Sequence, residues 1–137
     1  MKQKLALEWL KASHSDILVL EKIVNEDLIT HMTSFHSQQS VEKSLKALLE
    51  FHSLKVPRKH DVLMLKDLVC DFIDIPNEDI LEDLNTLYID SRYPGDIGLL
   101  PNGKPTLQDA QAFYTFANEI LNRVCKLLNV KKEDLIL

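Results

Sequence analysis

The sequence predicts an all-α protein, an up-and-down antiparallel bundle of three long and about two short helices. Apolar residues recur at spacings of three and four along most of the 137 residues, which is the repeat of amphipathic helices. No segment shows the sustained alternation of a strand. All three glycines and three of the five prolines lie between residues 94 and 105, so we expect one long interruption there.

The chain has the length and composition of one domain. Its 45% hydrophobic and 27% charged residues are an ordinary globular balance, and a chain of this size buries about two thirds of its unfolded surface. We expect a single bundle domain over residues 1–130 and a C-terminal tail over residues 131–137. The apolar end of that tail, Leu135–Leu137, is either frayed or docked on a partner.

The first two expected helices cover residues 2–24 and 30–53, separated by the polar residues 25–27. The inward face of the first carries Leu5, Trp9, Ala12, Asp16, Leu20 and Ile23. The inward face of the second carries Phe35, Gln38, Glu42, Leu45, Leu49 and His52, flanked by Val41 and Leu48. Pro57 prevents further helix, because proline fixes φ and lacks an amide proton.

The remaining three helices are predicted from capping residues and from apolar residues that share one face. The third begins near His60 or Asp61 and ends at Phe72, with Leu65, Leu68, Val69 and Phe72 inward. Asn77 caps the fourth, which presents Ile80, Leu81, Leu84, Leu87 and Tyr88 and ends at Arg92–Pro94. Thr106 and Asp109 form a capping box, with Asp in place of the usual Glu or Gln. The last long stripe is Ala110, Phe113, Ala117, Ile120, Val124 and Leu127.

Several classes of protein are excluded by what the sequence lacks. The longest apolar runs, such as Ile17–Leu20, are four residues long, whereas a membrane span needs about 20. The first residues do not resemble a secretory signal, and Cys70 and Cys125 stand alone, so we expect a cytoplasmic protein with two buried, reduced thiols. The histidines show no zinc-ligand spacing and the glycines form no phosphate-binding loop. We therefore expect neither a metal nor a cofactor.

The net charge of −5 conceals a local basic segment. Residues 43–66 contain six basic and two acidic residues, so this segment carries +4 and the rest of the chain −9. Such a distribution favours a phosphate-bearing ligand at one place over long nucleic acid along the surface. An equally good interpretation is a solvated helix end and loop.

Polar residues on the apolar stripes are the most informative, because burying them unpaired costs several kcal/mol. Asp16 interrupts the first stripe, and Gln38 and Glu42 interrupt the second. Two pairs at a spacing of four, Gln39 with Lys43 and Glu42 with Lys46, would extend this polar network. It either fixes the register of the helices or forms a polar pocket for a charged ligand.

Two further positions have alternative interpretations. Arg92 either neutralises the end of its helix or binds phosphate, with the ring of Tyr93 available for stacking. His60 either begins a capped helix or, beside Asp61, acts as a base. The sequence leaves these alternatives open.

Motifs along the whole chain resemble those of the HEPN domains (higher eukaryotes and prokaryotes nucleotide-binding). The segment Gln38–Ala47 resembles the QQxxEKxLKA helix of that family, Lys59–Val62 its THDL step, and Ser91–Pro94 its ARYP segment. Trp9–Ala12 with Asp16 resembles the first helix, and Asp109–Ala110 the last. The resemblance implies a helical bundle, usually dimeric, sometimes encoded beside a minimal nucleotidyltransferase in a toxin–antitoxin or two-component system.

The resemblance also bears on activity. Many HEPN domains are RNases that use an Arg followed after four to six residues by a His, and none of the three arginines here has such a His. The expected function is therefore a non-catalytic nucleotide-binding or regulatory subunit. The candidate nucleotide or phosphate ligands are Gln39, Glu42, Lys43, Lys46, His60, Arg92 and Tyr93. Two alternatives are an RNase with an unconventional site that uses His60 and Arg92, and a helical dimerisation module without a ligand.

Overall fold

The computed structural model describes residues 2–92 and 104–137, and the side chains of these residues except 2 and 89–92. The helices are α1 (Lys2–Ile23), α2 (Thr30–Phe51), α3 (Val62–Leu68), α4 (Glu78–Arg92) and α5 (Leu107–Leu127), with short 3₁₀ helices η1 (Asp27–Ile29) and η2 (Lys132–Leu135). No strand occurs in this part of the chain. The all-α bundle with three long helices is confirmed.

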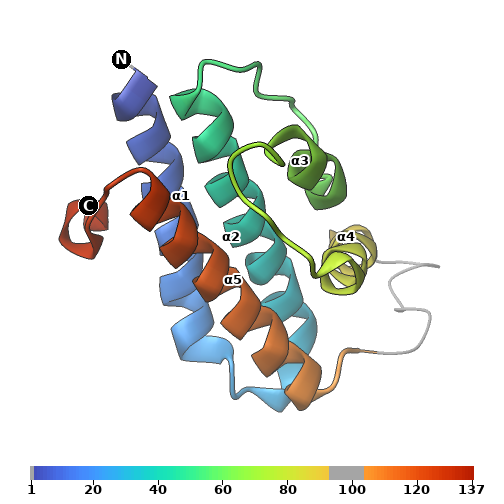
Figure 1. Ribbon diagram of the computed structural model, residues 1–137. Coiled ribbons are helices and arrows are strands. Elements are labelled where there is room, and N and C mark those ends of the chain that lie inside the picture. Colours follow the sequence, from blue (N-terminus) through green and yellow to red (C-terminus); the bar gives the residue numbers. More distant parts are fainter. Residues whose placement is uncertain (1, 93–103) are drawn as a thin grey trace.

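Helix α2 is the centre of the bundle. It contacts α1 and α5 on one side and α3 and α4 on the other, and α5 also contacts α1 (Figure 1). Consequently α2 is buried around most of its circumference, including small polar residues such as Thr33, Ser37, Ser40 and Ser44. An element with neighbours on both sides needs short side chains where another helix axis comes close.

The inward face of α1 is shifted by about one position along the sequence from the predicted apolar face. The buried positions are Ala6, Leu10, Ser13, Ile17 and Leu20, together with Asp16. Leu5 is 48% exposed, and Trp9, Ala12 and Ile23 are only partly buried. The apolar pattern did not reveal this face, because the polar residue Ser13 lies on it. Ser13 Oγ lies 2.8 Å from the Ser40 carbonyl and from the Ser40 and Ser44 hydroxyl oxygens.

The shorter helices begin and end largely as their sequence signals predict. The Asp61 side chain accepts a hydrogen bond from the Met64 amide and caps α3. However, α3 ends at Leu68 and continues as turns to Phe72, so Leu68 points outward with 46% exposure. The capping box of Thr106 and Asp109 is present at the start of α5. Leu127, in the last turn of α5, is exposed and not in the core.

The chain after α5 folds back on the bundle. Asn129 adopts a left-handed backbone conformation (φ 56°) and the Val130 amide bonds to the Cys125 carbonyl, which closes the helix end. The chain then enters η2, which contacts α1, and Leu135 is 1% exposed within the core. The tail was expected to be either frayed or docked on a partner. Leu135 is neither, because it packs against the core of its own chain.

Two other expectations can be compared with the described residues. No helix among them is long and apolar enough to cross a membrane. Both cysteines are free, but only Cys125 is buried, whereas Cys70 is exposed. The expectation of two buried thiols was therefore wrong for Cys70, which lies in the turns that follow α3, on a side facing away from the core.

Candidate functional site

Glu42 is the centre of a polar group that we call the Glu42 cluster (Gln38, Gln39, Glu42, Lys46 and His60). Its side chain lies midway along α2 and is only 4% exposed. Glu42 Oε1 accepts a hydrogen bond from His60 Nδ1 at 2.9 Å, and Oε2 accepts one from Lys46 Nζ at 2.9 Å. A buried carboxylate without such donors is strongly destabilising, so these contacts are what allow it to lie in the core.

Gln38 attaches the segment before α3 to α2, and Gln39 in turn holds the Gln38 side chain. Gln38 Nε2 donates to the backbone carbonyl of His60 at 2.8 Å and lies 3.3 Å from Glu42 Oε1. Gln39 Nε2 donates to Gln38 Oε1 at 2.8 Å. His60 is thus held by both its ring and its carbonyl group, yet 45% of its side chain remains exposed.

The proton position on His60 follows from its partner. A carboxylate can only accept, so Nδ1 donates to Glu42 and Nε2 is left for another group. This arrangement of a buried carboxylate behind a half-exposed imidazole is the one that orients a histidine for binding or for proton transfer.

Lys46 belongs to the core of the bundle. Its side chain is 5% exposed, it is bonded to Glu42, and its Nζ lies 5.5 Å from the ring centroid of Trp9. The predicted pair of Glu42 and Lys46 is confirmed. The ammonium group is nevertheless enclosed, because Trp9 of α1 covers this turn and donates to Glu50 at 3.3 Å. Lys46 is therefore not accessible to a phosphate.

A second polar group, the Asp16 cluster (Asp16, His36 and Lys43), joins α1 to α2. Asp16 Oδ1 accepts from His36 Nδ1 at 2.9 Å and Oδ2 accepts from Lys43 Nζ at 2.7 Å. The exposed fractions are 10% for the Asp16 side chain, 22% for His36 and 24% for Lys43. The predicted pair of Gln39 and Lys43 is wrong, because Lys43 extends toward α1 while Gln39 bonds to Gln38. The expected single network of Asp16, Gln38 and Glu42 is divided between two clusters.

A row of aromatic rings links the two clusters. His36 meets Phe35 edge to face at 5.2 Å between ring centroids, and Phe35 stacks on Tyr88 at 5.5 Å. Tyr88 in turn lies 5.1 Å from His60. Each end of this row is an imidazole held by a carboxylate, and the row passes through the interior between α2 and α4, because Tyr88 is only 5% exposed.

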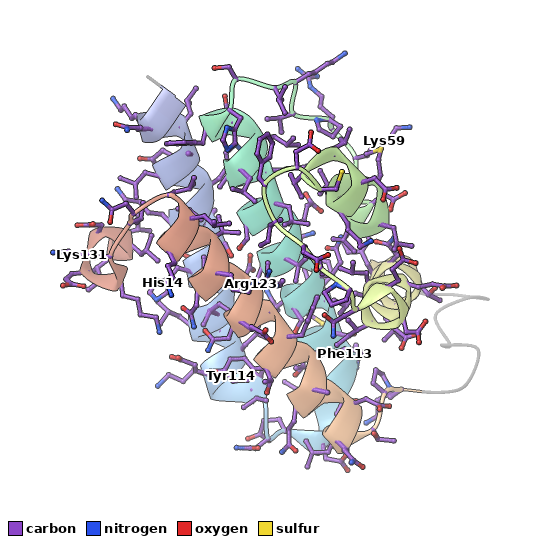
Figure 2. The ribbon with its side chains drawn as sticks, in the orientation of Figure 1. His14, Lys59, Phe113, Tyr114, Arg123 and Lys131 are labelled. Atoms are coloured by element: carbon purple, nitrogen blue, oxygen red, sulfur yellow. The ribbon has the colours of Figure 1, made fainter. Side chains whose placement is uncertain are left out.

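The basic segment of the sequence is the loop between α2 and α3. Lys55, Arg58 and Lys59 are exposed, and none of them forms an ion pair with another described residue. Figure 2 shows Lys59 at the outer surface of this loop. Unlike Lys43 and Lys46, which pair with Asp16 and Glu42, these three cations precede His60 and carry charge that no described carboxylate balances.

Two predicted ligands cannot be placed in the same detail. Arg92 is the last residue of α4, one turn of helix after Tyr88, but its side chain and all of Tyr93 lie outside the described residues. The proximity of Tyr88 to His60 shows that α4 passes beside the Glu42 cluster.

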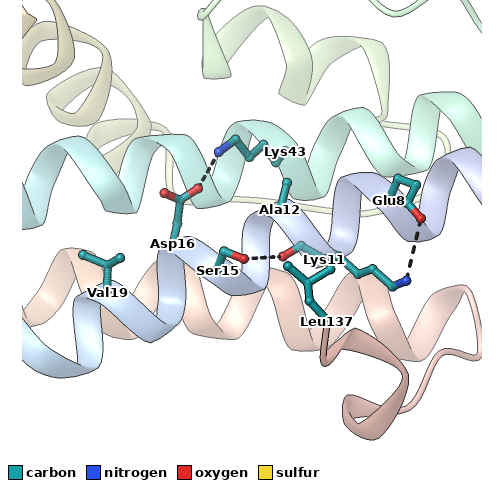
Figure 3. A pocket seen from close by; sticks show the side chains of 8 residues that line it. All are labelled: Glu8, Lys11, Ala12, Ser15, Asp16, Val19, Lys43 and Leu137. Atoms are coloured by element: carbon teal, nitrogen blue, oxygen red, sulfur yellow. Dashed lines mark hydrogen bonds and ion pairs between the residues drawn. The ribbon is translucent and has the colours of Figure 1, made fainter.

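An open hollow of about 390 Å³ lies along α1 beside the Asp16 cluster. Asp16 and Lys43 border it on one side, and Glu8 and Lys11 on the other (Figure 3). Because each cation faces a carboxylate, at 2.7 Å for Lys43 and 3.7 Å for Lys11, the hollow has no excess of either charge.

His36 is the residue that the sequence analysis did not select. Its position, seven residues before Lys43 and therefore two turns away on the same face, was the available signal. No group of three or more metal-ligating side chains occurs among the described residues. The structure therefore provides imidazoles oriented by carboxylates, with a cationic loop beside one of them.

The fold and site define an all-helical domain with one buried carboxylate on each of its first two helices, Asp16 on α1 and Glu42 on α2, and a cationic loop between α2 and α3. A family model of the HEPN domain matches residues 6–128, so the chain belongs to the HEPN domain family. No curated protein and no solved structure was found to match it.

Proposed function

We propose that this HEPN domain is a nucleotide-binding subunit that holds the phosphate of its ligand at His60 and the loop before it. The observation that carries the proposal is the hydrogen bond from His60 Nδ1 to the buried Glu42, which fixes a half-exposed imidazole at the end of a loop with three cations that pair with no described carboxylate. Membership of the HEPN family supports a nucleotide-related ligand.

The charge balance favours the loop between α2 and α3, and not helix α2 itself, as the phosphate site. The carboxylate of Glu42 already neutralises Lys46, and Asp16 neutralises Lys43. Lys55, Arg58 and Lys59 have no such partner among the described residues, so an anion there gains attraction without displacing an internal ion pair. Arg92, at the end of α4, remains our proposed further phosphate ligand, and Tyr93 a proposed stacking ring.

Isothermal titration calorimetry with the four nucleoside triphosphates tests this assignment. We expect binding that weakens at least about tenfold in His60→Gln and in a double variant, Arg58→Ala with Lys59→Ala, since charge-assisted hydrogen bonds contribute about 1.5–3 kcal/mol each. Lys126→Ala, which removes an exposed cation from α5, is the matched control and should bind like the wild type. Absence of heat with every nucleotide, while circular dichroism shows intact helices, would contradict the proposal.

A second candidate function is RNA cleavage centred on His60. It is favoured by the same contact with Glu42, because a carboxylate that orients an imidazole is a frequent device in general acid–base catalysis. Mixed RNA incubated with the wild type and with His60→Gln distinguishes the two. Cleavage that disappears in the variant supports an RNase, whereas unchanged RNA eliminates this candidate.

We also propose that the protein forms a homodimer and acts with a minimal nucleotidyltransferase. Both rest on the family resemblance. Light scattering behind size exclusion measures the mass with and without nucleotide, and co-purification with the product of an adjacent gene tests the partner. A dimer that binds no nucleotide would support the remaining alternative, a dimerisation module whose polar clusters only set the helix register.

A further inference from the structure

We propose that Asn85 of α4 is a positioning residue, which holds the chain at His60 in the orientation that the imidazole needs for its ligand. The inference rests on the proposed function and adds α4 to a site in which the hydrogen bonds to the His60 ring and carbonyl come from α2. It starts from the two hydrogen bonds that one amide group makes to the residues directly after His60.

Asn85 bonds to two consecutive residues at the start of α3. Its Oδ1 accepts from the Val62 amide at 3.0 Å, and its Nδ2 donates to Asp61 Oδ1 at 2.8 Å. Val62 is the first residue of α3, where backbone amides have no acceptor within the helix. Because Asp61 Oδ1 also accepts from the Met64 amide, Asn85 and Asp61 together supply acceptors for the first turn of α3.

The position of Asn85 in its own helix indicates a tertiary role. It lies in the middle of α4, and asparagine is a poor helix former, because its side chain competes for backbone hydrogen bonds in non-helical conformations. Both of its bonds reach residues that are 23 and 24 positions earlier in the chain. These contacts with α3 explain why a residue that weakens α4 is placed there.

Helix α3 is too short to fix its own start. It has seven residues, and a helix of that length is not stable without tertiary contacts. The position of His60, two residues before α3, therefore depends on the longer helices on either side. Gln38 of α2 holds the His60 carbonyl at 2.8 Å, and Asn85 of α4 holds the next two residues.

Helix α4 also contacts the imidazole itself. Tyr88 follows Asn85 by three positions, on the same face of α4, and its ring lies 5.1 Å from that of His60. Since Tyr88 is only 5% exposed, it limits rotation of the imidazole on the protein side. If Asn85 releases the chain after His60, the ring shifts against both Tyr88 and Glu42, and the 2.9 Å bond to Glu42 is weakened.

A double-mutant cycle tests whether Asn85 acts through His60. Calorimetry uses whichever of the four nucleoside triphosphates gives the largest heat with the wild type. We expect Asn85→Ala, which removes both bonds without adding charge, to weaken binding about tenfold. In the His60→Gln background the same substitution should weaken binding less than about twofold, because a positioning residue acts only through the side chain that it positions.

Controls separate this effect from a loss of stability. Asn122→Ala makes the same chemical change at an exposed position of α5 and should bind like the wild type. Asn85→Leu, an apolar side chain of similar size and a better helix former, is the second variant if Asn85→Ala unfolds, and it should weaken binding to the same extent. Unfolding of both variants would assign Asn85 to the structural core and overturn the positioning role.

A second measurement needs no ligand. In ¹⁵N NMR spectra of the histidine rings at pH 8, we expect His60 to carry its proton on Nδ1, because the hydrogen bond to Glu42 selects that tautomer. In Asn85→Ala this signature should weaken. His36, whose Nδ1 is held by Asp16 at 2.9 Å, is the internal control and should keep its signature.

The two proposals can fail separately. Wild-type affinity in folded Asn85→Ala, equal weakening in both backgrounds, or an unchanged His60 ring signal would each overturn the role of Asn85, while nucleotide binding at His60 stands. If no nucleotide binds to the folded wild type, the proposed function falls, and the ring signal alone decides whether Asn85 orients His60.

Discussion

Glu42 and His60 are 18 residues apart in the chain, and their side chains meet at 2.9 Å between Oε1 and Nδ1. This contact joins the buried centre of α2 to an exposed histidine at the edge of α3. It makes one carboxylate responsible both for packing, through Lys46, and for the orientation of the candidate ligand-binding residue.

Substituting Glu42 should therefore destabilise the whole fold. In Glu42→Ala the Lys46 ammonium loses the one carboxylate with which it pairs among the described residues, and an uncompensated buried charge typically costs about 3–5 kcal/mol. We expect a large decrease in the urea midpoint. Glu8→Ala removes an exposed carboxylate in a long 3.7 Å ion pair and should change stability by less than about 1 kcal/mol. Equal midpoints for the two variants would contradict the structural role of Glu42.

The cap of α5 should contribute measurably to the free energy of unfolding. Thr106→Ala removes the side-chain acceptor for the Asp109 amide and should cost about 1 kcal/mol. Thr115→Ala makes the same change within the exposed part of α5, where the hydroxyl only donates to the Gln111 carbonyl. Because alanine is the better helix former there, this control should be neutral or stabilising. Thermal unfolding followed by circular dichroism compares them.

The two thiols should differ in reactivity. Burial raises the pKa of Cys125 to about 11, and the thiolate is the reactive form, whereas Cys70 is exposed. Ellman's reagent should therefore titrate one thiol in the native protein at pH 8 and two after unfolding. Cys70→Ser should abolish the native signal. Two rapid thiols in the native state would contradict the burial of Cys125.

The same thiol predicts a loss of stability at alkaline pH. Its pKa is near 9 in the unfolded chain and about 11 in the fold, so the unfolded state ionises first. The stabilisation is complete below pH 9 and declines as the pH rises toward 11. In Cys125→Ala this part of the decline should disappear, which urea unfolding at pH 8 and pH 10.5 measures.

The burial of Leu135 predicts that the C-terminal turn supports the bundle. Leu135→Ala deletes a side chain that is 1% exposed and should cost about 2–5 kcal/mol. Ile136→Ala, at the next position with 71% exposure, is the matched control and should be nearly neutral. If Leu135→Ala unfolds at the same denaturant concentration as the control, η2 is not part of the cooperative core.

The sequence predicted the helices well because the relevant signals are local. Thr106 and Asp109 cap α5 as expected, and apolar spacing located all five α-helices. The inward faces were predicted less well, since Leu68 and Leu127 are exposed and α1 is rotated. Its inward face contains Ser13, whose hydroxyl is bonded to α2, and a serine in that role cannot be recognised without knowing the neighbouring helix.

For the candidate site, the sequence predicted which polar residues are buried better than it predicted which residues they contact. Asp16, Gln38 and Glu42 are buried, as their places on apolar stripes indicated. Their partners depend on tertiary packing: Lys43 reaches across to Asp16, and Trp9 covers Lys46. His36 was missed for the same reason, because its carboxylate comes from another helix, 20 residues earlier in the chain.

The attachment of the loop between α2 and α3 has an evolutionary consequence. Its beginning follows the closed end of α2, where Ser53 takes a left-handed conformation (φ 58°), and its end is tied down through His60. Between these anchors most side chains are exposed, although Val56 packs against the core, and lengthening such a segment costs little conformational entropy. Insertions there can therefore alter the length of this loop among descendants of this chain while the helical scaffold is inherited unaltered.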